Sequence, residues 1–429
     1  MSNSIIITGG SQLIGNVTVS GAKNSALPLL FATLLTDKAC ILKNVPDIED
    51  ISVTIRLLKH CGANVVFSDH ELRVQTKNIT NVEASYALVK KLRASFWLLG
   101  PLLARTGEAR IALPGGDAIG TRPVDIHLKG LTALGADIRL QNGMVVAKAS
   151  QGLHGARIVL DFPSVGATHN LLMAASLIEG DTILENAARE PEIVELCLFL
   201  KRMGATIEGI GSSSISIHGK RTLGSGKCTV IGDRIEAATY LAACAVTGGQ
   251  IMVEGITPQA LGKTLDVLAE AGCIIKLKDH GINIQSSGEL SAVSFETAPS
   301  PGLATDVQPI LMAMLTKSSG TSIIKENVFE NRYGHVAEYR RLGADIEIDD
   351  RMAVVRGVSF LTGAPVEAGD IRAAAGLVLM GLGARGETTV HEIFHLERGY
   401  ENMVQKLSDL GAQIRYGAAY EDRDLIFGC

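Results

Sequence analysis

Charged and polar side chains recur at the starts of several strongly apolar segments. Lys23 and Asn24 precede Leu27–Leu35, and Asp306 precedes Val307–Leu315. Other polar residues at equivalent positions are Arg93, Ser164, Asp233, Arg234, Asp370 and Arg372. If the apolar segments are helices, their N-termini favour anions, because the helix dipole and the free N–H groups attract negative charge. The pattern therefore predicts a site for an anionic small molecule.

A second group of polar residues lies in loops that follow short apolar strands. These loops are LPGGDAIGTRPVD from Leu113, NAAREPE from Asn186, ENVFENR from Glu326 and FHLERGYE from Phe394. In a strand–helix–strand unit with parallel strands, such loops and the helix N-termini share one edge of the sheet, where open α/β sheets bind ligands. We therefore expect both groups to face one cleft.

Single residues in these groups have simpler explanations. Lys23 and Arg93 taken alone are typical of surface charges, and Asp306 alone is typical of a helix N-cap. His391 and His395 lack the spacing of a zinc motif, so no metal is expected. The shared structural position of the polar groups, rather than any one residue, indicates a functional site.

The elements that must position these groups form six copies of one unit. A helix ending in glycine and followed by a strand recurs at intervals of roughly 70 residues. The six glycines are Gly62, Gly135, Gly204, Gly272, Gly343 and Gly411. Glycine enters the left-handed conformation easily, so each is expected to end its helix. Each unit is read as helix, strand, loop, amphipathic helix and two short strands.

The first helix of every unit is apolar almost all round, which is typical of a helix buried on every side. These segments are Leu27–Leu35, Phe96–Ala104, Asn170–Ile178, Ala237–Val246, Val307–Leu315 and Ala373–Gly383. The second helices carry charge on one face. We therefore expect core helices, surface helices and strands between them.

Composition limits the class of protein. The chain has 429 residues, 46% of them hydrophobic, which favours two domains with sizeable cores. A net charge of −5 without a basic tract argues against nucleic-acid binding. Seven cysteines without CxxC spacing favour a reducing compartment. No signal peptide or membrane span is expected, so the expected location is the cytoplasm. The sequence leaves the oligomeric state open.

Seven motifs in order resemble those of the UDP-N-acetylglucosamine 1-carboxyvinyltransferases, enolpyruvyl transferases that begin peptidoglycan precursor synthesis. They are Ser20–Pro28, Leu92–Ser95, Leu113–Asp125, Ser164–Thr168, Asn186–Ile193, Asn327–Arg332 and Arg398–Glu401. The resemblance implies an inside-out α/β barrel of two domains, each with three units. One domain would combine residues 1–21 and 231–429, and the other would span 22–230, with a mobile catalytic loop at 112–125.

The resemblance also implies a reaction and its residues. The sugar 3′-hydroxyl would attack C2 of phosphoenolpyruvate, and phosphate would then leave; no cofactor is implied. The implied catalytic residues are Lys23, Asp117, Asp306 and Arg398. The implied phosphoenolpyruvate contacts are Lys23, Asn24, Arg122, Arg332, Arg372 and Arg398. The implied contacts of the nucleotide sugar are Arg93, Arg122, Pro123, Val124, Asp125, Ile126, Ser164, Val165, Gly166, Asp306 and Val328.

Two positions depart from the pattern of many relatives. Asp117 stands where many relatives have a cysteine, which is their proton donor and the target of fosfomycin. A carboxyl has an ordinary pKa of about 3.9, against about 8.5 for a thiol, so it must be kept protonated to donate. We therefore expect the enzyme to be insensitive to fosfomycin. Phe162 stands where some relatives carry a basic residue, so the resemblance implies no uridine or phosphate contact at this position.

Two other functions fit part of the pattern. The sister enzyme that acts on shikimate 3-phosphate would also have six units and clustered cations. The loop LPGGDAIGTRPVD and the segment AREPE favour the nucleotide-sugar enzyme. A non-catalytic repeat protein would keep its surface helices polar, but the fully apolar helices here need enclosing sheets.

Overall fold

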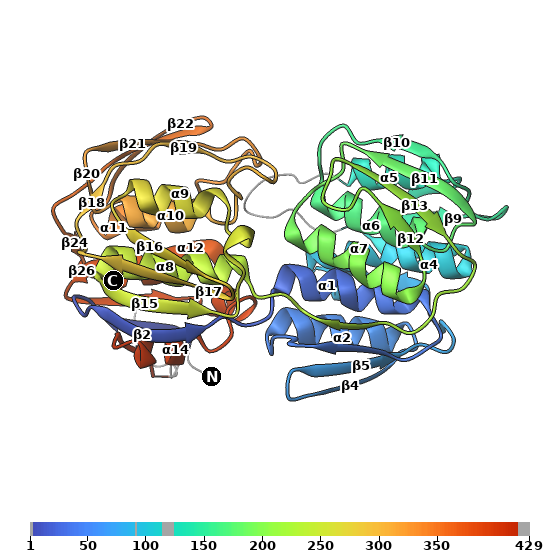
Figure 1. Cartoon of the computed structure of the whole chain (residues 1–429), viewed down its shortest axis with the longest axis horizontal. Coiled ribbons are helices and arrows are strands. Elements are labelled where there is room, and N and C mark those ends of the chain that lie inside the picture. Colours follow the sequence, from blue (N-terminus) through green and yellow to red (C-terminus); the bar gives the residue numbers. More distant parts are fainter. Residues whose placement is uncertain (1–2, 91, 114–123, 419–429) are drawn as a thin grey trace, which may run out of the picture.

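The computed structural model describes residues 3–90, 92–113 and 124–418. These residues form two bodies that lie side by side and are joined by two connecting segments (Figure 1). Each body has its own hydrophobic core. One core runs from Ala26 to Val230, and the other combines Ile5–Val19 with Ile235–Ile414. We call them the N-terminal body and the C-terminal body.

Six four-stranded sheets in the described residues follow one plan. An outer strand pairs in parallel with a central strand, and two further strands continue the sheet antiparallel. The N-terminal body has β14 (Lys227–Thr229), β3 (Cys40–Lys43), β5 (Glu71–Gln75) and β4 (Asn64–Ser68); β6 (Glu83–Ala84), β7 (Glu108–Ala112), β9 (Met144–Lys148) and β8 (Asp137–Gln141); and β10 (Arg157–Val159), β11 (Gly180–Glu185), β13 (Ser214–Gly219) and β12 (Thr206–Glu208).

The C-terminal body repeats the plan. Its sheets are β2 (Leu13–Thr18), β15 (Gly249–Glu254), β17 (Gly281–Ser286) and β16 (Ile274–Lys278); β19 (Phe295–Glu296), β21 (Thr321–Lys325), β23 (Met352–Arg356) and β22 (Asp345–Asp349); and β25 (Pro365–Glu367), β27 (Glu387–His391), β1 (Ser4–Thr8) and β28 (Gln413–Tyr416). Two short parallel pairs are β18 (Leu290–Ser291) with β20 (Ser318–Ser319), and β24 (Leu361–Thr362) with β26 (Ala384–Arg385).

The predicted apolar helices lie inside these sheets. They are α1 (Lys23–Ala32) with η1 (Thr33–Leu35), α4 (Leu99–Thr106) after η2 (Arg93–Leu98), α6 (Val165–Ala175), α8 (Arg234–Thr247), α10 (Gln308–Leu315) and α12 (Ile371–Gly383). Every residue of α8 from Ile235 to Val246 is buried. Helices α8, α10 and α12 pack against one another, with strands on the outside of the body (Figure 1). The predicted inside-out α/β barrel is confirmed.

The amphipathic helices cover the outer parts of each unit. They are α2 (Glu49–His60), α5 (Asp125–Ala133), α7 (Pro191–Met203), α9 (Lys263–Glu270), α11 (Val336–Arg341) and α14 (Met403–Asp409); shorter turns are α3 (Tyr86–Val89), η3 (Pro258–Ala260) and α13 (Phe394–Glu397). The six predicted glycines follow these helices with φ between +91° and +115°. Only glycine adopts this conformation without strain, which explains the repeat signal.

Strands from distant parts of the chain complete three of the sheets. β1 fills the third place of the last sheet, and β2 forms the outer strand beside β15. In the N-terminal body, β14 forms the outer strand beside β3. The chain therefore passes between the bodies twice, and the two passages meet in an antiparallel bridge between Gly21 and Gly232.

Candidate active site

Asp306 lies just before α10 at the centre of a group of charged residues. Its Oδ2 accepts hydrogen bonds from Arg372 Nη2 at 3.1 Å and from Asn24 Nδ2 at 3.5 Å. Burial raises the pKa of the Asp306 carboxyl, but the positive charges of Arg372, Arg332 and Arg234 outweigh burial and hold the pKa well below its usual value. Asp306 is therefore a carboxylate at neutral pH.

Asp370 and Arg332 complete the group of charged residues around Asp306. Asp370 caps α12, because its Oδ1 accepts from the backbone N–H of Arg372 at 2.7 Å and of Ala373 at 3.0 Å. Its Oδ2 lies 3.4 Å from Arg332 Nη1. Arg332 is buried, and its positive charge helps to lower the pKa of Asp306. We call Asp306, Arg332, Asp370 and Arg372 the Asp306 cluster.

Tyr400 packs against the same cluster. The Arg372 guanidinium carbon lies 5.6 Å from the centre of the Tyr400 ring, within the range of a cation–π contact. The buried Arg372 Nε has no hydrogen-bond partner among the described residues. An unpartnered buried donor is costly, so the arginine is held by its charge pair and ring contact rather than by a complete hydrogen-bond set.

A second cluster joins the two bodies. Asp50, in the first turn of α2, lies 3.0 Å from Lys23 Nζ through its Oδ2 and 2.9 Å from Arg398 Nε through its Oδ1. Lys23 begins α1 in the N-terminal body, whereas Arg398 follows α13 in the C-terminal body. The backbone N–H of Asp47 donates to Glu401 Oε1 at 3.0 Å beside this group. We call Lys23, Asp50 and Arg398 the Asp50 cluster.

The bodies also meet along the loop that follows β11. Arg234 Nε lies 2.9 Å from Glu192 Oε1, and both side chains are largely buried. The backbone N–H of Ser300 donates to Glu190 Oε1 at 3.1 Å, and Arg189 Nε donates to the Ser300 carbonyl at 3.2 Å. The polar loops of the two bodies therefore face each other, as the shared strand-end position predicts.

The N-terminus of α6 gathers several N–H donors. Ser164 caps it, since its Oγ accepts from the Ala167 N–H at 3.3 Å. A side chain added at Gly166 would come within 3.1 Å of His127 Nε2 and 3.2 Å of Trp97 Nε1. The backbone there therefore passes close beneath two ring nitrogens.

The tautomer of His127 follows from its neighbours. The amide of Asn170 is fixed, because its Oδ1 accepts from the Gly100 N–H at 2.6 Å and its Nδ2 donates to the Phe96 carbonyl. Its Nδ2 also lies 3.1 Å from His127 Nδ1, so that nitrogen accepts and the proton sits on Nε2. Burial, helped by the charge of Arg93, lowers the pKa of His127 to about 3. The neutral ring thus presents an N–H toward Gly166.

Other residues implied by the resemblance occupy the same edges. Val124, Asp125 and Ile126 lie at the start of α5. The Val328 N–H donates to Glu326 Oε1 at 2.8 Å, and Glu326 Oε2 accepts from Thr305 Oγ1 beside Asp306. Phe162 is half-exposed two residues before Ser164. Asp117, Arg122, Pro123 and most of the expected loop 112–125 lie outside the described residues.

Sequence reasoning placed Asp370 and the segment that contains Glu192 among the clustered polar positions, but it did not select Asp50, Trp97 or His127 as site residues. Asp50 is one of two acidic residues in the first turn of α2, a position that the helix dipole alone explains. Its burial depends on contacts with residues far along the chain. His127 and Trp97 are also brought to Gly166 by packing between separate helices, which a single sequence does not reveal.

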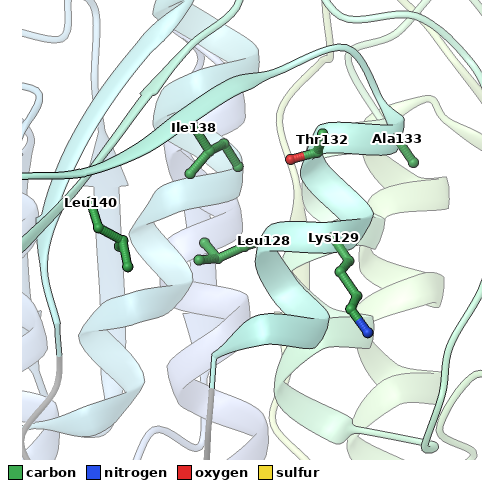
Figure 2. A pocket seen from close by; sticks show the side chains of 6 residues that line it. All are labelled: Leu128, Lys129, Thr132, Ala133, Ile138 and Leu140. Atoms are coloured by element: carbon green, nitrogen blue, oxygen red, sulfur yellow. The ribbon is translucent and has the colours of Figure 1, made fainter.

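One hollow of the described surface lies away from both clusters. It has a volume of 530 Å³ between α5 and β8 and is lined by Leu128, Lys129, Thr132, Ala133, Ile138 and Leu140 (Figure 2). Figure 2 shows mainly aliphatic side chains around it, with Lys129 as the charged group. It shares no lining residue with either cluster, and Lys129 is the one charged side chain among the residues that line it.

The described residues contain neither a candidate metal centre nor a candidate membrane span. No group of three or more histidine, cysteine, aspartate or glutamate side chains is arranged to hold a metal ion in residues 3–90, 92–113 and 124–418. In the same part of the chain, no helix is long and apolar enough to cross a membrane.

Comparison with known proteins assigns the family. The model of the family described as EPSP synthase (3-phosphoshikimate 1-carboxyvinyltransferase) matches residues 7–407. A protein of Xanthobacter autotrophicus named UDP-N-acetylglucosamine 1-carboxyvinyltransferase is 49% identical, with 96% of this chain and 98% of that protein covered. A protein of Caldanaerobacter subterraneus named UDP-N-acetylglucosamine 1-carboxyvinyltransferase 1 is 47% identical, with 96% and 99% covered.

Solved structures agree on the architecture. The enolpyruvyl transferase NikO from Streptomyces tendae superposes with a TM-score of 0.86 at 27% identity, covering 96% of this chain and 98% of that one. EPSP synthase from Acinetobacter baumannii gives 0.76 at 18% identity, covering 97% and 100%, which shows the fold alone. The chain therefore belongs to the EPSP synthase family, within the group whose members are named UDP-N-acetylglucosamine 1-carboxyvinyltransferase.

Proposed function

We propose that this protein transfers the enolpyruvyl group of phosphoenolpyruvate to the 3′-hydroxyl of UDP-N-acetylglucosamine and releases phosphate. The observation that carries the proposal is the 47–49% identity, over nearly the whole chain, to relatives named for this reaction. The reaction would be the first committed step of peptidoglycan precursor synthesis, in the cytoplasm. The Asp306 cluster and the Asp50 cluster supply positive charges that could bind its anionic substrates.

The cations of the Asp50 cluster are proposed to bind phosphoenolpyruvate. Arginine binds phosphate and carboxylate oxygens through paired N–H groups, and lysine supplies a point charge. Lys23 and Arg398 come from different bodies and converge on one carboxylate. Arg122 is proposed as their partner, with Asn24, Arg372 and the charge of Arg332 acting from the side of Asp306.

Asp306 is proposed to receive the sugar hydroxyl. In the first step an O3′–C2 bond forms, C3 gains a proton and the hydroxyl proton is lost. In the second step the C2–O bond to phosphate breaks and C3 loses a proton. Because its pKa is held low, the Asp306 carboxylate accepts a hydrogen bond throughout but keeps a proton only weakly. It would orient the hydroxyl and pass its proton on.

The N-terminus of α6 is proposed to bind the nucleotide sugar at Ser164, Val165 and Gly166. Helix N–H groups and the dipole favour a diphosphate there. The ring N–H groups of His127 and Trp97 lie beside Gly166 and support the same preference. Arg93, Val124, Asp125, Ile126 and Val328 are proposed as further contacts, together with Arg122 and Pro123.

Asp117 is proposed as the proton donor to C3. Fosfomycin reacts with a thiol at the equivalent position of relatives, so the drug should leave this enzyme active and unlabelled. Asp117→Cys should remain active and become sensitive. An adduct of the wild-type protein by mass spectrometry would contradict the proposal, and so would an active Asp117→Cys variant that the drug does not affect.

The two bodies are proposed to be two domains that close around the substrates, residues 1–21 with 231–429 and residues 22–230. Separate hydrophobic cores and the paired passages at Gly21 and Gly232 support this division. Closure would keep Lys23 and Arg398, which already meet at Asp50, around the bound substrate and exclude water from the reaction.

Product identification tests the proposal. The protein is incubated with phosphoenolpyruvate and either UDP-N-acetylglucosamine or shikimate 3-phosphate, and the products are analysed by mass spectrometry. We expect an enolpyruvyl adduct of the nucleotide sugar only. An adduct of shikimate 3-phosphate alone would assign the sister reaction, and the absence of any adduct would leave a binding protein with this fold.

A further inference from the structure

We propose that Asp50 is a positioning residue whose carboxylate competes with phosphate for Lys23 and Arg398. It would keep the two cations together when the site is empty and weaken their hold on phosphate once that product forms. The inference rests on the proposed function only in taking these two cations as the phosphoenolpyruvate site.

The geometry places one buried carboxylate beneath two more accessible cations. The Asp50 side chain is 2% exposed, whereas Lys23 is 12% and Arg398 is 32% exposed. Asp50 engages Lys23 Nζ, Arg398 Nε at 2.9 Å and Arg398 Nη2 at 3.5 Å. Lysine has three donors and arginine five, so an incoming anion has further N–H groups to bind on the open side.

The alternative explanation, a helix-dipole contact, does not account for this burial. Glu49 occupies the same first turn of α2 and pairs outward with Arg56 at 2.7 Å, with both side chains half-exposed. A surface acid at this position already satisfies the dipole. Burying a second carboxylate is costly unless cations compensate it, and Asp50 has two.

The net charge of the Asp50 cluster determines whether Asp50 strengthens or weakens the binding of phosphate. Two cations and one carboxylate leave a net charge of +1, which attracts phosphate less strongly than two uncompensated cations would. A carboxylate a few ångströms from the anion also repels it directly. Asp50 therefore weakens the binding of inorganic phosphate, and product release is faster than it would be without Asp50.

The position of Asp50 also explains how the two cations are held together. Lys23 and Asp50 belong to the N-terminal body and Arg398 to the C-terminal body. Without a shared carboxylate the two cations would repel each other across the junction of the bodies. The neighbouring hydrogen bond from the Asp47 N–H to Glu401 holds the same junction and does not depend on the Asp50 charge.

The test compares three variants by calorimetric titration with inorganic phosphate at fixed salt and by steady-state kinetics. Asp50→Asn should bind phosphate about tenfold more tightly, since one negative charge is removed. It should show lower kcat and a KM for phosphoenolpyruvate that does not rise. Asp50→Glu, whose carboxylate reaches further toward the cations, should bind phosphate more weakly and raise that KM. Glu49→Gln makes the same charge change in the same turn and should stay within about twofold of wild type.

Each outcome decides the inference. Phosphate affinity that is unchanged or weaker in Asp50→Asn would overturn it, as would a tenfold change in Glu49→Gln. If Asp50→Asn does not fold, Asp50→Glu decides alone, and unchanged or tighter phosphate binding contradicts the inference. Wild-type protein that binds phosphate but makes no adduct with UDP-N-acetylglucosamine would instead count against the proposed function.

Discussion

The two charged clusters are built differently although both face the junction of the bodies. The Asp306 cluster lies wholly in the C-terminal body, where Asp370 caps α12 and buried arginines surround the carboxylate. The Asp50 cluster exists only where the bodies meet, and its arginine is partly exposed. The first is therefore pre-organised by the fold, whereas the second depends on how the bodies approach.

This difference indicates separate roles for the two clusters. The Asp306 cluster suits the chemical step, and the Asp50 cluster suits the capture of substrate as the bodies close. A group that receives a proton needs a fixed position and a controlled pKa, which a rigid, buried setting supplies. Groups that capture a small anion benefit from exposure and from movement that encloses it. Substitutions in the Asp306 cluster should therefore affect kcat and stability, whereas those at Arg398 should affect substrate binding.

The largest effect is expected at Asp306. Asp306→Asn removes the carboxylate but keeps the shape of the side chain, so kcat should fall by about 1,000-fold because a proton acceptor is lost. The KM for phosphoenolpyruvate should change little. Initial rates of phosphate release check this. A variant with wild-type kcat would contradict the role of Asp306, and Asn24→Ala, which removes only a weak contact, serves as a milder comparison.

Substitutions of Arg372 and Arg398 allow a direct comparison of the two clusters. Arg372→Gln removes a buried arginine from its ion pair with Asp306, whose side chain is 31% exposed, and should lower the free energy of unfolding by about 1.5–3 kcal/mol, the contribution of a hydrogen bond to a charged group. Arg398→Gln should cost less stability, because the buried Asp50 keeps Lys23 as a partner, and it should raise the KM for phosphoenolpyruvate about 30-fold, since a charged hydrogen bond is lost. Denaturant unfolding and kinetics measure both. The comparison fails if the two variants lose similar stability.

Glu236 tests whether buried charge in the C-terminal body limits stability. Burial raises its pKa to about 7 although Lys406 Nζ lies 2.7 Å from its Oε1. A carboxyl with a raised folded-state pKa stabilises the protein below its unfolded pKa, and this stability is lost as pH rises through 7. Wild type should lose up to about 3 kcal/mol between pH 4.5 and 7 relative to Glu236→Gln. Parallel pH profiles of unfolding free energy would contradict this.

Gly166 should give the smallest effect, confined to one substrate. Gly166→Ala places a methyl group against His127 and Trp97, where the nucleotide sugar is proposed to bind. The KM for UDP-N-acetylglucosamine should rise about tenfold, the equivalent of one or two lost contacts, while that for phosphoenolpyruvate stays unchanged. Gly334→Ala, which meets open space, is the matched control. A rise in both KM values would show a general distortion of the site.

Repetition made most of the fold predictable. Six glycines after amphipathic helices, and six helices apolar on all sides, indicated closed bodies with helices inside. The exchange of β1, β2 and β14 between distant units could not be read from the repeat, because short strands carry little signal and their partners are chosen by tertiary packing.

The candidate site was predictable only where residue type and position coincide. Asp306 and Arg372 stand at the starts of apolar helices, and the structure pairs them. Asp50 stands in an ordinary acidic helix turn, and Trp97 and His127 look like core aromatics until packing brings them beside Gly166. Contacts between the bodies depend on long-range geometry, which single-sequence patterns do not contain.

The most direct test of the central claim is the initial rate of phosphate release from phosphoenolpyruvate with one acceptor at a time. We predict release with UDP-N-acetylglucosamine, none with shikimate 3-phosphate, and the same rate when fosfomycin is present. Release with shikimate 3-phosphate only, or release with neither acceptor, would contradict the proposed transferase activity.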